Sequence, residues 1–85
     1  MKVLISSALY SYTGGAAVVA KGETLVAVLA DLERRYPGIR FRMIDEQGRM
    51  RPHIRFFVGG EQVREMTQPL RPGDELLIVQ ALSGG

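Results

Sequence analysis

The residues best suited to chemistry in this sequence lie at its end. An apolar strand pattern, Leu76 to Val79, leads directly into residues 80–85. Six extended residues reach about 20 Å, and glycine has no Cβ that would clash in a narrow channel. We interpret residues 80–85 as a flexible tail that presents the Gly85 carboxylate to a partner's active site, the alternative being a frayed end without function. The tail residues of the predicted site are Leu82, Ser83, Gly84 and Gly85.

Elsewhere the sequence offers few groups for catalysis. It has no cysteine, which excludes a thiol nucleophile, a disulfide and a cysteine-based metal site. His53 is the only histidine, and it follows Pro52 without an obvious carboxylate partner, so we interpret it as a strand-entry residue rather than a base or ligand. We therefore expect no metal site and no bound cofactor.

Composition limits the class of protein further. Eighty-five residues with 46% hydrophobic content predict one globular domain, residues 1–85. A net charge of +2 is too small to indicate a nucleic-acid partner, and no apolar run is long enough for a membrane span. The apolar opening is broken by serines and tyrosines, so we expect no targeting segment and a cytoplasmic protein. Five arginines lie close together in the sequence: Arg40, Arg42, Arg49, Arg51 and Arg55. We interpret them as a solvated face; the alternative is that they steer an acidic partner toward the chain.

Hydrophobic periodicity predicts a strand pair followed by one helix. Residues 3–9 alternate as a half-buried strand, residues 12–15 form a turn, and residues 16–20 return as an antiparallel strand. Thr24 is the expected N-cap of a helix over residues 24–36, and Pro37-Gly38 ends it. One apolar stripe should face the sheet, with Asp31 away from it; the stripe consists of Leu25, Val28, Leu29, Leu32 and Tyr36.

The second half predicts three more strands. Residues 39–53 are left undecided, because 39–43 alternate like a strand but also suit a helical turn. Residues 54–58 and 61–63 form a hairpin around Gly59-Gly60, and residues 75–80 form the last strand. The order predicts an α+β fold in which a mixed sheet packs on one main helix, with the first and last strands adjacent in the middle.

Strand alternation also predicts an exposed apolar patch. If the first, last and 54–58 strands are neighbours, the residues facing away from the helix gather on one surface, where such patches often mark interfaces. These partner-binding candidates are Leu4, Phe57, Leu77 and Val79.

Several segments resemble the prokaryotic ubiquitin-like sulfur-carrier family typified by ThiS and MoaD, which has the β-grasp fold. They are Leu9 with residues 12–15, residues 31–38, the 57–61 hairpin, residues 69–76 and the tail 81–85. The likeness covers nearly the whole chain. It departs at Gln80, where relatives often have proline, and at Gly59-Gly60, where Asn-Gly is common. It also departs near Tyr10, where the branch that resembles the cysteine-biosynthesis carrier often has a basic residue.

The resemblance implies a sulfur carrier rather than an enzyme. An E1-like adenylating enzyme would use ATP to activate Gly85, and a sulfurtransferase or persulfide donor would convert it to a thiocarboxylate. A downstream synthase would then accept the sulfur. In some members of the family the carrier is itself the small subunit of that synthase, which is the alternative for this chain. The acceptor stays open among molybdopterin, thiazole, cysteine, tRNA and a siderophore-like product. Two alternatives are a ubiquitin-like modifier conjugated through Gly85 and a non-catalytic β-grasp binding module.

Overall fold

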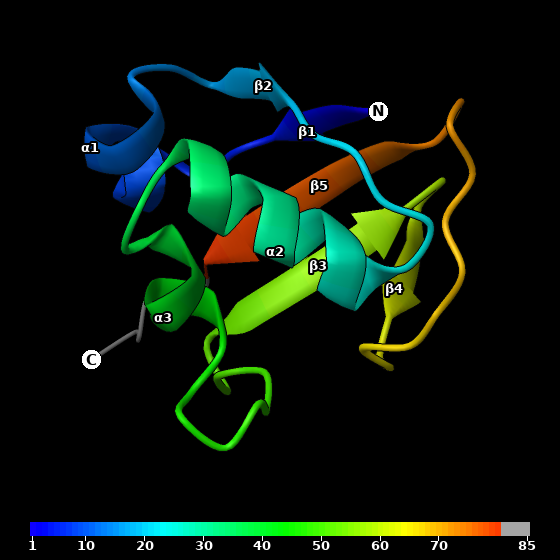
Figure 1. The fold of residues 1–85 in the computed structure, drawn as a ribbon. Coiled ribbons are helices and arrows are strands. Elements are labelled where there is room, and N and C mark those ends of the chain that lie inside the picture. Colours follow the sequence, from blue (N-terminus) through cyan, green and yellow to red (C-terminus); the bar gives the residue numbers. More distant parts are fainter. Residues whose placement is uncertain (81–85) are drawn as a thin grey trace.

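One mixed sheet with a helix across it organises residues 1–80, the part of the chain that the computed structural model describes (Figure 1). The strand order is β2-β1-β5-β3-β4, and only the β1–β5 pair is parallel. The strands are β1 (Lys2–Leu4), β2 (Ala17–Val19), β3 (Ile54–Val58), β4 (Glu61–Val63) and β5 (Glu75–Gln80). The helices are the 3-10 helix η1 (Ser7–Leu9), α1 (Tyr10–Thr13), α2 (Leu25–Arg35) and α3 (Ile39–Met43). The predicted α+β arrangement is confirmed, including adjacent first and last strands at the centre.

Helix α2 forms where the apolar stripe predicted it, and its first turn is capped from two directions. The Thr24 hydroxyl accepts a hydrogen bond from the Ala27 N–H at 3.3 Å. Carbonyls of Gln68 and Met66 accept from the Leu25 and Val26 N–H groups, so the loop before β5 satisfies donors that the helix itself cannot. Four residues of the stripe are fully buried against the sheet and close the core over it: Leu25, Val28, Leu29 and Leu32.

The first strand is shorter than predicted. β1 ends at Leu4, and the chain then turns through η1 and α1 instead of continuing to Leu9. Leu9 is still fully buried, because the turn carries it into the core at helical rather than strand spacing. α1 ends at Gly14, whose φ of 74° is the left-handed conformation that glycine adopts without strain. The residues predicted as a hairpin turn are therefore a helix end.

Residues 39–43, which the sequence left undecided, form the short helix α3. Gly38 takes a φ of 98°, which redirects the chain after α2. The Glu33 carboxylate then accepts hydrogen bonds from the Gly38 and Arg40 N–H groups at 2.9 and 3.0 Å, and these bonds lower the pKa of Glu33. Helical spacing buries Ile39 and Met43 together, a result that strand alternation would also have given for this pair.

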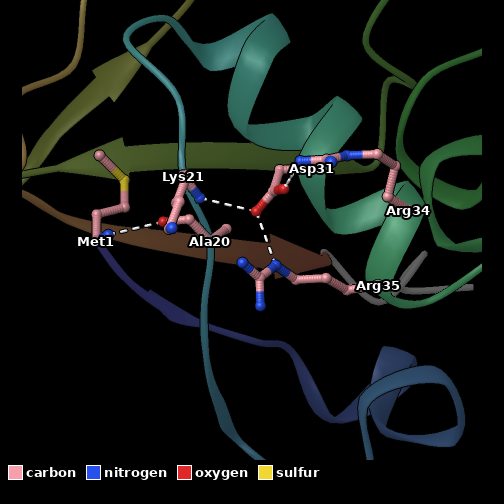
Figure 2. A network of polar contacts seen from close by, with 6 residues as sticks. All are labelled: Met1, Ala20, Lys21, Asp31, Arg34 and Arg35. Atoms are coloured by element: carbon pink, nitrogen blue, oxygen red, sulfur yellow. Dashed lines mark hydrogen bonds and ion pairs between the residues drawn. The ribbon is translucent and has the colours of Figure 1, made fainter.

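Asp31 is buried, contrary to the prediction that it lies away from the core. Its side chain is only 3% exposed, and Figure 2 shows its carboxylate between the chain that leads into α2 and two arginines. The Lys21 N–H and Arg35 Nε each donate to Oδ2 at 2.8 Å, and Arg34 donates to Oδ1. The two arginines compensate the charge of the buried carboxylate. The hydrogen bond from the Lys21 N–H joins residue 21 to the middle of α2.

These contacts, led by the hydrogen bond from the Lys21 backbone, lower the pKa of Asp31 from 3.8 to about 2. A carboxyl with a depressed folded-state pKa stabilises the fold fully above its unfolded pKa and loses that contribution as the pH falls toward the folded value. We predict that Asp31→Asn lowers the midpoint of urea unfolding at pH 7, and that its difference from wild type shrinks between pH 3.8 and about 2. Glu46→Gln, at an exposed carboxylate, is the matched control. A pH-independent difference would contradict this account.

Gly22 is required by a close backbone approach. A Cβ at this position would lie 2.6 Å from the Val28 nitrogen and 2.8 Å from the Ala27 carbonyl carbon, both backbone atoms of α2. We expect Gly22→Ala to lower the free energy of unfolding by more than about 1 kcal/mol. Gly73→Ala, where a Cβ meets nothing within 4 Å, should change it far less. Equal unfolding midpoints for the two variants in urea would contradict the packing argument.

Candidate functional site

The predicted tail residues Leu82, Ser83, Gly84 and Gly85 lie outside the described residues, but the point from which the tail starts is well defined. β5 is the central strand, and its last residue, Gln80, pairs with Ile54 at the beginning of β3. On the helix side, Leu76 and Ile78 are fully buried. Pairing with β1 over residues 75–77 and with β3 over residues 76–80 therefore holds the strand, and β3 alone holds its last residues at the root of the tail.

Three of the four predicted partner-binding residues meet on the outer face of the sheet. Leu77 pairs with Leu4 of β1 on one side and with Phe57 of β3 on the other, so the three side chains form one row across three strands. We call the depression around them the apolar hollow; it has a volume of about 390 Å³ and is lined by Leu4, Phe57, Gly59, Gly60, Glu75 and Leu77. Leu77 is 39% exposed there.

The lining glycines and one ion pair shape the hollow. Gly59 and Gly60 have φ values of 60° and 84°, which a two-residue hairpin turn of this kind requires, and they contribute no side chains to fill the space. The carboxylate of Glu75 lies 3.9 Å from the Lys2 ammonium, an exposed pair that adds little stability. The hairpin and Glu75 were not among the predicted site residues, although the strand register would have placed them next to Leu77.

Val79, the fourth candidate, does not line the hollow. It is half-buried, pairs with Arg55 of β3 and lies next to the root of the tail. Leu77 stands three residues before Gln80, or about 10 Å along the strand. The apolar hollow is therefore set back from the tail, with Val79 between them.

Three of the five clustered arginines, Arg42, Arg51 and Arg55, lie on two adjoining hollows that share Arg51. Arg51 and Arg55 line an open hollow together with Arg64, which the sequence cluster did not include. Arg51 also lines a second hollow with Phe41, Arg42 and His53. His53 is exposed and precedes β3, as predicted for a strand-entry residue.

The described residues include two kinds of surface that suit binding, one apolar and one rich in arginine. Among residues 1–80, no three His, Cys, Asp or Glu side chains are grouped so that they can hold a metal ion. No helix in that part of the chain has the length and apolar character needed to cross a membrane. The root of the tail adjoins the hollow lined by Arg51, Arg55 and Arg64, and the apolar hollow lies about 10 Å back along β5. Apolar and arginine-rich surfaces together suit docking to another protein.

Comparisons with known proteins agree with this geometry. The family model described as "ThiS family" matches residues 3–85. Sulfur carrier proteins named CysO from Mycobacterium tuberculosis and Mycobacterium bovis are 36% identical over 89 residues, covering 98% of this chain and 96% of theirs.

Solved structures give the same result for the fold. CysO in the Amycolatopsis orientalis BexX/CysO complex has a TM-score of 0.91 at 33% identity, covering 99% of this chain and 98% of that one. M. tuberculosis CysO has a TM-score of 0.88 at 33% identity, covering 95% and 98%. SAMP1 from Haloferax volcanii has a TM-score of 0.80 at 25% identity, covering 100% and 98%. With a β-grasp fold, a family match over nearly its whole length and sulfur carriers among its homologues, this chain belongs to the ThiS family.

Proposed function

We propose that this chain is a sulfur carrier protein, a single domain of residues 1–85, and that sulfur is carried on the carboxyl group of Gly85. The observation that carries the proposal is the match to the ThiS family model through Gly85, together with the match to CysO over 98% of this chain and the central strand that leads into the tail. The similarity to CysO favours the cysteine branch among the acceptors that the sequence leaves open.

The proposed chemistry belongs to partners, and the carrier contributes position. A carboxylate has no good leaving group, so an E1-like enzyme first joins Gly85 to AMP and releases pyrophosphate from ATP. Sulfide displaces AMP to give the thiocarboxylate; with a persulfide donor, a thiol must then cleave the resulting acyl disulfide. A downstream synthase accepts the sulfur. Because these steps use ATP, we place the protein in the cytoplasm.

The apolar hollow is the surface that we assign to docking of the E1-like enzyme. Ordering a tail costs about 1–2 kcal/mol per residue, so contacts of the folded domain must offset that cost. In the row Leu4–Leu77–Phe57 the three residues are in register, Leu77 is exposed and the other two are half-buried. Val79 extends the row toward the tail. An apolar row of this kind can be desolvated by a partner at low cost.

Conjugation to other proteins is a second candidate function. The observation in its favour is the likeness to SAMP1, titled a small archaeal modifier protein, at a TM-score of 0.81 and 25% identity for the Methanosarcina acetivorans structure. Both functions begin with the same adenylate, so the product after activation distinguishes them.

Charge placed in the apolar hollow should weaken docking without unfolding the domain. We predict that Phe57→Glu and Leu77→Glu each raise the Kd for the E1-like enzyme, measured by calorimetry, because a carboxylate would have to be desolvated in the interface. Val26→Glu is the matched control: Val26 is 38% exposed, like Leu77 at 39%, but lies on α2. Wild-type Kd values for both hollow variants would remove the hollow from the proposal.

Removal of Gly85 should abolish activation while leaving the fold intact. The deletion moves the carboxylate back by roughly 3.5 Å, and a misplacement of about 1 Å can already cost on the order of 100-fold in rate. We expect wild type to gain about 16 Da, oxygen replaced by sulfur at an activated acyl group, when incubated with ATP, sulfide and the E1-like enzyme. The shortened chain should gain nothing and keep its Tm, and Gly84→Val should act similarly through a clash in the channel.

The same mass spectra separate the candidate functions. Isopeptide-linked conjugates that accumulate in place of the 16 Da product would favour the modifier. A 16 Da gain at the wild-type rate by the chain lacking Gly85 would overturn the assignment of sulfur to this end. A chain whose partners bind equally well without Gly84 and Gly85, and which is never activated, would be a binding module.

A further inference from the structure

The root of the tail lies beside arginines that form no ion pair within residues 1–80. Arg51, Arg55 and Arg64 line a hollow that also includes Ile54, and Ile54 is the residue that pairs with Gln80. Arg42 lies on the adjoining hollow, which shares Arg51. We call these four residues with Phe41 the arginine surface: Phe41, Arg42, Arg51, Arg55 and Arg64.

Two of these arginines are held in place by backbone carbonyls instead of carboxylates. Arg51 Nε donates to the Phe41 carbonyl at 2.7 Å, and its guanidinium lies 4.6 Å from the centroid of the Phe41 ring. Arg55 Nη1 donates to the carbonyls of Pro52 and Ile54. A guanidinium fixed in this way keeps its full charge and loses less rotamer freedom when a partner binds.

Nearby carboxylates are engaged elsewhere. The ion pairs found within residues 1–80 involve Lys2, Arg34 and Arg35, and none involves the arginine surface. Asp45 feels the charges of Arg49 and Arg51, but its Oδ1 accepts the N–H groups of Gln47 and Arg49. Phe41 is 58% exposed, and the Arg51 guanidinium lies over its ring. The surface thus combines unpaired positive charge with an exposed aromatic ring.

The length of the tail determines which part of the partner enzyme faces these arginines when the tail is inserted. Five residues follow Gln80, and five residues of chain span at most about 17 Å. When the Gly85 carboxylate reaches the nucleotide in a partner's active site, the arginines therefore stay outside the channel, far from the phosphates. The groups that face them belong to the rim of the channel.

From this geometry we propose that the arginine surface docks on an acidic rim around the channel of the E1-like enzyme that activates the tail. This inference rests on the proposed function. It assigns the two surfaces different tasks: the apolar hollow supplies desolvated contact area, and the arginines steer the tail toward the channel and set its approach. It also states a property of the partner, namely Asp and Glu side chains around the entrance and an apolar recess for Phe41.

The test measures the affinity of the full-length chain for the E1-like enzyme by calorimetry without ATP. Arg55→Glu combined with Arg64→Glu should raise Kd about tenfold or more at about 0.1 M salt. The difference should nearly vanish at about 1 M salt, where the Debye length falls from about 10 Å to about 3 Å. Arg55→Lys, which keeps the charge, should retain most of the affinity. The Phe41→Ala variant should also bind more weakly, but with little salt dependence.

Arg71 supplies the control for net charge. It is exposed in the turn before β5, at the end of the sheet opposite the tail root. Arg71→Glu alone, and with Lys21→Glu to match the double reversal, should leave Kd within about twofold of wild type, since distant exposed charges are screened. Equal losses for the control and the test variants would overturn the proposal, and so would a loss that persists at high salt.

The outcomes also separate this inference from the proposed function. Weaker binding by the arginine variants supports the arginine surface whether or not the 16 Da product forms, whereas the product depends on Gly85. Wild-type affinity in the double reversal overturns the surface even if sulfur transfer is confirmed. A wild-type chain that does not bind the enzyme overturns both. Binding to single-stranded RNA that the same substitutions abolish, with unchanged affinity for the enzyme, would replace the protein partner by a nucleic acid.

Discussion

Pairing of β5 on both edges is the constraint on which the rest of the structure depends. β5 runs parallel to β1 and antiparallel to β3, so the strand that leads to the tail is also the strand that joins the two hairpins. The same pairing aligns Leu4, Leu77 and Phe57 on one face and buries Leu76 and Ile78 on the other. The core, the apolar hollow and the root of the tail therefore all depend on the register of β5.

Periodicity predicted the elements whose burial follows a simple repeat. The α2 stripe, the β3–β4 hairpin and the central β1–β5 pair agree with the structure because each side chain's face follows from its position in the repeat. The prediction failed at Leu9, which is buried by a turn rather than by strand alternation, and at Asp31, whose burial requires donors from three separate residues. Neither outcome can be derived from local spacing, since both depend on contacts formed only in the folded chain.

The candidate site, too, was predicted only in part from the sequence. Alternation was sufficient to gather Leu4, Phe57 and Leu77, but it did not show that Val79 stands apart or that Arg64 joins Arg51 and Arg55. That grouping depends on the β4 hairpin folding back beside β3 and on the loop before β3. The charged part of the surface is thus less accessible to sequence reasoning than the apolar part, because arginine side chains carry no periodic signal of where they lie.

The position of β5 also has a mechanical consequence. A force applied to the tail acts along the axis of β5, which pairs with β3 over residues 76–80 and with β1 over residues 75–77. Such a load is shared by the rungs of both ladders at once, in shear, whereas an edge strand would be peeled away one rung at a time. A pull on this end of the chain would therefore meet more resistance than the same pull on the edge strand β2 or β4.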